Sequence, residues 1–347
     1  MKYLTKTAEN REEWDNFITS HPESNFLQSW DFYEFHLSRG KKVVRRLFFS
    51  PENPEKILAA YAGVVETAKR GTYLAIAGGP ILDWDNKPLK TAVFKDIKTQ
   101  GIAENCAFVR VRPQLELSHL GTALKFPQNS AISLKKAPMY LSVEYAGILD
   151  LTKSEAEILA GASQGFRRKL RKAEKAGISI ETSTDPKEIE TFYQIELAHA
   201  QRQKFIPFSK DYLQKQFAAF AKNDEAILYT AKLNNEILAQ NFMIFYGHEA
   251  SYHYGVSTDL GTKYSAAPLL HLAAMDEARA RGISRYNLWG IVEKDQTSHR
   301  FYGVSEFKRS FGCAELRYIP AHDLILNKPK YLKTWTIETF RRKFRHV

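Results

Sequence analysis

The sequence lacks the features that mark several protein classes. Its 347 residues include only two cysteines, Cys106 and Cys313, so we expect neither a disulfide framework nor a thiolate zinc site. It has no run of eighteen apolar residues, and its polar N-terminus lacks the apolar stretch of a secretory signal. The sequence therefore predicts a globular, cytoplasmic protein.

Several cofactor and metal motifs are also missing. There is no Walker loop, no Rossmann glycine fingerprint and no H-E-x-x-H motif, and the histidines are scattered without the spacing of zinc ligands. We therefore predict neither a metal nor an organic cofactor.

Positive charge is the most evident property that the chain does have. Lys and Arg number 50 against 39 Asp and Glu, a net charge of +11. Such a field attracts phosphates, nucleic acid or anionic lipid. It indicates a class of partner but does not specify a reaction.

Helix-like and strand-like patterns alternate along both halves of the chain. In the first half we expect helices over 9–21 and 26–40, and strands over 42–50, 56–67, 72–83 and 107–113. In the second half we expect helices over 155–177, 185–203, 209–223, 267–282 and 329–345, and strands over 145–151, 178–183, 225–233, 236–246, 249–257 and 285–291. This order predicts two α/β units with mixed sheets flanked by helices.

We place the domain boundary near Ala146. The first domain is predicted to span 1–146 and the second 147–314. The final segment, 315–347, is expected to cross back and complete the first domain, because its helix has no sheet of its own to cover.

One predicted helix carries a dense basic face. Phe166, Leu170 and Ala173 share one side of it, whereas five cations fan across the other: Arg167, Arg168, Arg171, Lys172 and Lys175. The face has few acidic partners at helical spacing. Both a phosphate-binding face and an ordinary solvated face remain open at this point.

Single residues elsewhere have two interpretations each. Arg202 ends a predicted helix, where a guanidinium either forks onto a diphosphate or complements the helix dipole. Tyr252 and Tyr254 are expected on one face of their strand and His253 on the other. A tyrosine hydroxyl there is either a substrate contact or part of the core.

An acyl-CoA enzyme is a further alternative. Arg300-Phe-Tyr-Gly303-Val-Ser305 approaches the R/Q-x-x-G-x-G/A pyrophosphate loop of acetyltransferases, but it ends in Ser and lies late in the chain. The match is therefore incomplete. Lys308, in "EFKRSFG" at 306–312, is either a solvated helix cation or a cation directed at a reaction.

Taken together, the motifs resemble the Fem aminoacyltransferases, which build peptidoglycan branches from aminoacyl-tRNA. The matching stretches, in order, are "FLQSWDFYEF", "GGPILD", "VRVRP", "RRKLRKAEKAGI", "AQRQKF", "YHYGVST", "AAPLLHLAAMDEARARG", "YNLWGI", "EFKRSFG" and "DLILNKPKY". The resemblance implies two tandem domains of the N-acetyltransferase (GNAT) type. Residues 147–315 leave no room for the helical arm of some members, so we expect the compact, armless type.

The resemblance also implies roles for particular residues. Lys308 and its neighbour Phe307 would line the catalytic centre, with the lysine stabilising the oxyanion formed when an amine attacks the ester. Arg202 would hold the diphosphate of the acceptor, Tyr254 its peptide stem or a phosphate, and Trp30 its sugar end. Trp30 is equally typical of a core aromatic. No dedicated base is evident, because Arg112 precedes Pro113 where the family often has an acid.

The implied partners are aminoacyl-tRNA, bound by the basic helix, and UDP-MurNAc-pentapeptide or lipid II as the acceptor. The inner face of the cytoplasmic membrane is a further partner to consider, with the protein peripheral to it. Two rival functions remain open: an acyl-CoA-dependent N-acyltransferase on the same fold, and a non-catalytic protein that binds RNA or a membrane surface through its basic faces.

Overall fold

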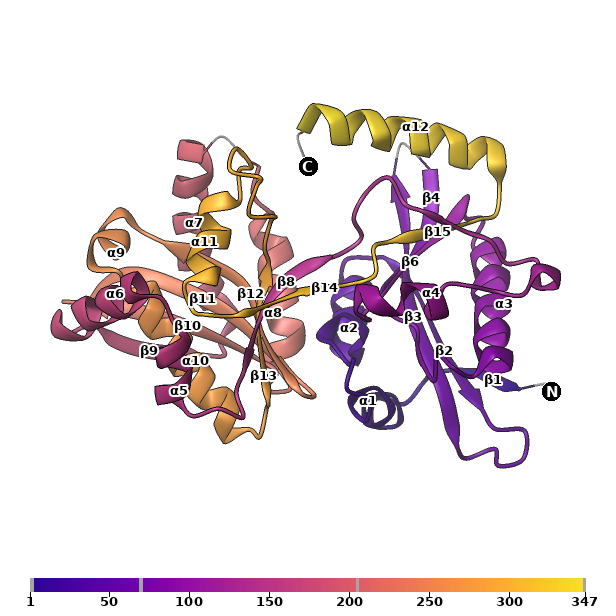
Figure 1. Cartoon of the computed structure of the whole chain (residues 1–347), viewed down its shortest axis with the longest axis horizontal. Coiled ribbons are helices and arrows are strands. Elements are labelled where there is room, and N and C mark those ends of the chain that lie inside the picture. Colours follow the sequence, from indigo (N-terminus) through magenta and orange to yellow (C-terminus); the bar gives the residue numbers. More distant parts are fainter. Residues whose placement is uncertain (1–2, 69–70, 204–205, 346–347) are drawn as a thin grey trace. The chain divides into compact units, whose positions relative to one another are not determined.

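The computed structural model describes residues 3–68, 71–203 and 206–345, without the side chains of 202–203 and 343–345. The chain forms two compact units (Figure 1), one made of Met1–Glu144 with Arg317–Val347 and the other of Tyr145–Leu316. Each unit contains one mixed sheet with helices packed against it.

The sheet of the first unit has the order β1-β2-β3-β4-β6-β15-β7, with β5 paired to β3. β4 and β6 are parallel, and the other neighbours are antiparallel. The strands are β1 (Leu4–Thr7), β2 (Lys42–Phe49), β3 (Ile57–Ala68), β4 (Gly71–Gly78), β5 (Ile81–Leu82), β6 (Phe108–Pro113), β7 (Leu134–Lys136) and β15 (His322–Ile325).

The helices of this unit are α1 (Arg11–Thr19), α2 (Trp30–Ser38), α3 (Lys87–Ala103), α4 (Leu120–Ala123) and α12 (Lys328–Arg345), with 3-10 turns at Phe26–Gln28, Leu117–His119 and Gln128–Ser130. The sequence analysis did not predict α3. Its side chains Leu89, Val93 and Ile97 recur every four residues and are buried in the core beside the sheet.

A buried ionic cluster ties the C-terminal segment to this sheet. Arg110 of β6 donates from Nε to Oδ1 of Asp323 on β15 at 2.7 Å, and from Nη2 to Oε2 of Glu338 on α12 at 2.8 Å. All three side chains are almost fully buried. Removing one partner would leave an uncompensated charge in the interior, so the cluster fixes the positions of β15 and α12.

The sheet of the second unit has the order β14-β8-β13-β12-β11-β10-β9. β12 and β13 are parallel, whereas β9 to β12 pair antiparallel, and β10, β11 and β12 are joined by short turns as a meander. The strands are β8 (Tyr145–Asp150), β9 (Ser179–Ser183), β10 (Ala226–Leu233), β11 (Glu236–Tyr246), β12 (Glu249–Ser257), β13 (Arg285–Gly290) and β14 (Ala314–Arg317).

Helices cover both faces of the second sheet. They are α5 (Glu155–Gly161), α6 (Gln164–Lys175), α7 (Ile189–Gln203), α8 (Lys210–Ala221), α9 (Asp259–Tyr264), α10 (Ala267–Ala280) and α11 (Tyr302–Arg309), with a 3-10 turn at Pro186–Glu188. Met243 of β11 lies in the core beneath α6 and α10, and its neighbour Phe242 contacts Phe217 of α8. Adjacent strand residues point to opposite faces, so α7 and α8 cover the second face.

Two properties of the helices bear on function. Within the described part of 145–316 the longest helix, α7, has 15 residues, so no long helical arm extends from this unit. None of the described helices has the length and apolar character needed to cross a membrane.

Candidate active site

The candidate site begins where the parallel strands of the second unit part. β12 and β13 pair over Glu249–Ser251 and Arg285–Asn287, and beyond this point their pairing ends. Trp289 then adopts a left-handed backbone with φ of 66°, which bulky residues rarely do. The register of β13 against β8 also shifts before Gly290. Strained backbone of this kind is common at functional sites.

Lys308 fills the space beside this irregular strand end. It lies in the last turn of α11, is 6% exposed, and donates from Nζ to the carbonyl oxygen of Gly290 at 2.8 Å. Its Nζ also lies 5.6 Å from the ring centroid of Tyr252. Among the described residues, no carboxylate lies within 4 Å of it. Lys308 is therefore a buried amine and not a solvated helix cation.

The burial of Lys308 changes its acid–base behaviour. Removal from water lowers the pKa of its amine from 10.5 to about 7, with the nearby Cys313 acting weakly in the opposite direction. The sequence analysis assumed a permanently charged lysine. At neutral pH this amine instead populates both protonation states, a property typical of functional lysines.

Aromatic side chains hold Lys308 and its neighbour in place. The ring of Phe307 lies 5.6 Å from that of His271 and 5.2 Å from that of Phe311. His271 Nδ1 is 2.7 Å from the hydroxyl of Tyr286, and burial lowers the pKa of His271 to about 3. This imidazole is therefore neutral. Phe307 packs into the wall and positions the lysine.

A β-bulge separates the two tyrosines of β12. Phe242 pairs with Tyr254 and Met243 with Tyr252, which leaves His253 as the extra residue. The expectation that both tyrosines share one face was wrong, because a bulge breaks the strand alternation. Tyr252 contacts His271 of α10 on one face, whereas Tyr254 packs on Phe242 on the other.

Tyr254 belongs to a second polar cluster. Its hydroxyl shares a hydrogen bond with Tyr212 of α8, and the ring of Phe208 lies 5.8 Å from Tyr254 and stacks on Tyr212 at 4.4 Å. Burial raises the pKa of Tyr254 well above 10, and the charge of Glu196 on α7 contributes. The three rings are therefore in contact, and the charge of Glu196 acts on Tyr254.

Glu196 is a residue that the sequence analysis missed. Its Oε2 is buried and accepts no hydrogen bond from the described residues, and burial raises the pKa of its carboxyl to about 7. The signal was present in the sequence. Glu196 stands four residues from both Phe192 and Ala200, which are buried on the same side of α7. A carboxyl on an apolar face without a partner is a candidate ligand group.

The other residues predicted for substrate binding are not all described. Trp30 begins α2 in the first unit, where the Arg45 guanidinium lies 3.8 Å above its ring and donates to its carbonyl oxygen at 3.2 Å. Trp30 is partly exposed and thus open to a ligand. Arg202 lies in the last turn of α7, but its side chain is outside the described residues.

The basic face of α6 has two kinds of cation. Arg167 donates to three carbonyl oxygens at the end of α5, at 2.6 to 3.2 Å, and Lys172 donates to the carbonyl of Lys263 at 2.5 Å. These two cations satisfy backbone groups, and Arg171 also donates from Nε to the carbonyl oxygen of Arg167 at 3.3 Å. Arg168, Arg171 and Lys175 are exposed, without an ion pair in the described part of the chain.

Local structure explains the incomplete acetyltransferase match and a G-x-S-x-G motif that the sequence analysis missed. The segment from Arg300 to Ser305 runs into the first turn of α11, and the Ser305 hydroxyl accepts from the amide of Val292 at 3.0 Å. Gly161-Ala-Ser-Gln-Gly165 has nucleophile-elbow spacing, but its serine, Ser163, caps α6. Within the described ranges no group of His, Cys, Asp or Glu side chains could hold a metal ion.

Comparison with known proteins decides the family. The profile of the FemAB family matches residues 10–238 and 230–338, which is nearly the whole chain. This chain belongs to the FemAB family. The predicted relationship to the Fem proteins is thereby confirmed.

The relatives in this family include the aminoacyltransferase FemA of Staphylococcus aureus (strain MRSA252). It is 20% identical over 410 aligned positions, which cover 95% of this chain and 97% of FemA. The crystal structure of FemX covers 97% of this chain and 100% of its own, at 20% identity and a TM-score of 0.84.

A tandem GNAT protein from the clavulanic acid biosynthesis pathway also has a related fold. It covers 94% of this FemAB member and 98% of its own chain, at 11% identity and a TM-score of 0.56. The prediction of an α/β fold with mixed sheets of the GNAT type is confirmed.

Proposed function

We propose that this FemAB member is an aminoacyltransferase that transfers an amino acid from aminoacyl-tRNA to the side-chain amine of a peptidoglycan precursor stem peptide. The acceptor is UDP-MurNAc-pentapeptide or lipid II, and the reaction takes place in the cytoplasm, where charged tRNA is found. The observation that carries the proposal is the buried amine of Lys308 beside the strained end of β13. The name of its relative FemA, an aminoacyltransferase, supports the reaction class.

The chemistry needs placement and charge stabilisation. The donor is an activated ester, so the acceptor nitrogen attacks its carbonyl carbon directly and forms a tetrahedral oxyanion. The bond from carbon to the ribose oxygen then breaks, and that oxygen takes up the proton that the amine loses. The protein has to hold both reactants in line and stabilise the negative oxygen.

Lys308 suits this step in two ways. As an ammonium it has three N–H groups, of which one binds the carbonyl of Gly290, so the others are available to an oxyanion. Loss of one oxyanion donor typically lowers the rate by ~10²–10³. A pKa of about 7 also lets the same group carry a proton between amine and ribose oxygen.

Glu196 and the rings of Phe208, Tyr212 and Tyr254 provide a place for an ammonium group. Aromatic faces attract cations, and a buried carboxylate without a partner gains most from a charged donor. Both substrates carry such a group: the acceptor amine before it loses its proton, and the α-amine of the donor. When the bound group is the acceptor amine, Tyr254 contacts the stem peptide at its side-chain ammonium.

The remaining contacts follow the family motifs. Arg202 is assigned to the acceptor diphosphate and Trp30 to its sugar end. Arg168, Arg171 and Lys175 of α6 are assigned to the tRNA backbone, because their charges are exposed and unpaired within the described residues. The acyl-CoA alternative has less support, since its loop residues run into α11.

A reconstituted transfer assay tests the function. Purified protein, charged tRNA and UDP-MurNAc-pentapeptide or lipid II should yield a muropeptide heavier by one aminoacyl residue, and Lys308→Met should reduce its rate by about 10²-fold or more. Lys153→Met, at an exposed lysine of the second unit with no assigned role, is the matched control. Absence of product with every charged tRNA, or acyl transfer from acyl-CoA instead, contradicts the proposal.

A further inference from the structure

The last helix of the chain has an exposed face of unusual composition. Its described cations, all exposed, are Lys328, Lys330, Lys333, Arg341 and Arg342. None of them forms an ion pair within the described residues. The one acid of α12, Glu338, is fully buried against Arg110. All the described charges on the solvent side of α12 are therefore positive.

Large apolar side chains lie among these cations. Leu332 is 61% exposed and Phe340 is 58% exposed. The two are about 80° apart around the helix, with Lys333 beside them. The buried face, with Thr334 and Glu338, lies on the opposite side. The other cations lie on the two flanks, between the apolar pair and the buried face. An exposed apolar pair flanked by cations is typical of helices that lie in a membrane interface.

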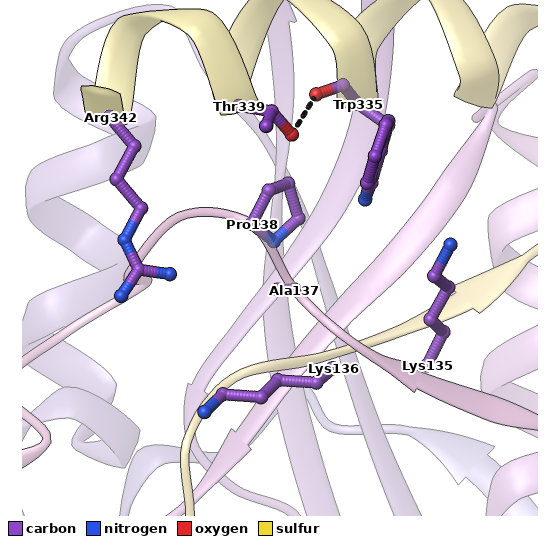
Figure 2. A pocket seen from close by; sticks show the side chains of 7 residues that line it. All are labelled: Lys135, Lys136, Ala137, Pro138, Trp335, Thr339 and Arg342. Carbon is purple, nitrogen blue, oxygen red and sulfur yellow. Dashed lines mark hydrogen bonds between the residues drawn. The ribbon is translucent and has the colours of Figure 1, made fainter. Parts of the chain in front are cut away.

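A pocket opens on the neighbouring side of α12. Figure 2 shows Trp335 and Arg342 descending from the helix toward the strand that carries Lys135 and Lys136. The hollow measures about 320 Å³. The ammonium of Lys135 lies 4.8 Å from the centroid of the Trp335 ring.

The pocket is suited to an anion. Three cations line it: Lys135, Lys136 and Arg342. The half-buried carboxylate of Glu144 interacts electrostatically with two of them, Lys136 and Arg342. One Glu144 oxygen already accepts the backbone amide of Ala321 at 2.9 Å. A phosphate would therefore meet net positive charge beside an indole, a side chain enriched at membrane interfaces.

We propose that α12 and this pocket dock the protein onto an anionic lipid bilayer. Leu332 and Phe340 enter the interface, the helix cations face the negative surface, and the pocket holds a lipid phosphate. RNA is the competing polyanion, but an RNA backbone offers nothing to an exposed leucine, whereas acyl chains do. A lipid-linked acceptor would benefit from such docking, although the surface is independent of the proposed reaction.

Vesicle flotation with the full chain tests this surface. Wild type should float with vesicles of phosphatidylcholine and 30% phosphatidylglycerol, and not with phosphatidylcholine alone; 0.5 M salt should weaken binding. The double variant Leu332→Asp/Phe340→Asp should bind at least tenfold more weakly, and Arg342→Gln about fivefold. Ile102→Asp, at a side chain 57% exposed elsewhere in the first unit, should bind as wild type does.

Three results would overturn the proposal. The first is that wild type does not bind anionic vesicles, and the second is that the double variant binds them as wild type does. The third is that the double variant loses affinity for bulk tRNA while its vesicle binding is unchanged. The last outcome would assign the surface to RNA. Circular dichroism of each variant verifies folding, and vesicle binding does not depend on transfer activity.

Discussion

Replacing Lys308 by methionine should make the protein more stable at neutral pH even though it removes the proposed catalytic group. Methionine has a similar length and carries no charge. Active-site groups held in unfavourable surroundings commonly show this conflict between stability and activity. The stability measurement therefore tests the state of Lys308 without any substrate.

The size of the effect is set by the lowered pKa. The difference between 10.5 and about 7 corresponds to about 5 kcal/mol of unfavourable free energy for the folded, charged form. Below pH 7 the lysine is charged in both states, and the fold carries this cost in full. Between pH 7 and 10.5 the unfolded chain binds a proton that the folded chain does not, so the free energy of unfolding rises with pH.

The replacement also removes a hydrogen bond. The carbonyl of Gly290 would lose its donor, at a cost of about 1–3 kcal/mol. At pH 6 the Lys308→Met variant should therefore be more stable than wild type by about 2–4 kcal/mol. At pH 10 the cost of the charge has fallen to about 1 kcal/mol, so the variant should be equally or less stable.

Urea unfolding at pH 6, 8 and 10 measures this dependence, with hydrogen exchange of peptides from 145–316 to isolate the second unit. The exposed Lys175→Met on α6 should show no comparable trend. Two results would refute the inference that burial of this charged amine destabilises the fold. Either Lys308→Met is less stable than wild type at pH 6, or the stability change is the same at pH 6 and pH 10.

Three further predictions concern activity and packing. If the ammonium of Lys308 is required, kcat/KM should fall as pH rises through about 7, once it is corrected for ionisation of the acceptor amine. The Lys308→Arg variant should not show this decrease. Glu196→Gln should raise KM for one substrate about tenfold or more with a smaller change in kcat, and varying each substrate in turn shows which ammonium it binds; equal effects on both KM values would contradict a specific ammonium site. Gly255→Ala should destabilise the second unit by about 1–3 kcal/mol in thermal unfolding, because the new Cβ would lie 1.9 Å from the Tyr252 hydroxyl, whereas Gly165→Ala, with no atom closer than 3.8 Å, should not.

Periodicity was sufficient to predict many of the strands and helices. The strand expected over 236–246 is β11, and the helix expected over 267–282 contains α10. α3 was missed although its signals were present: a capping residue, Asn86, a proline at its start and apolar residues every four positions. Its buried Lys90, whose ammonium donates to the carbonyl of Thr122, interrupts the apolar pattern.

The site depended on contacts that no local pattern contains. The bulge at His253 arises from pairing with β11, so nothing in "SYHYGVS" itself reveals it. The sequence left Lys308 as either a solvated helix cation or a cation directed at a reaction, whereas the structure exposes Val304 at 48% and buries Lys308. Tertiary packing of α11 against β13 determines which side is covered, and with it the pKa of the lysine.

The position of β15 determines the order in which the chain can be assembled. β7 has β15 as its strand partner, and Arg110 has its carboxylates on β15 and α12. When the ribosome has synthesised residues 145–316, the sheet of the first unit still lacks β15. The second unit can therefore fold before the first, although the first begins earlier in the sequence.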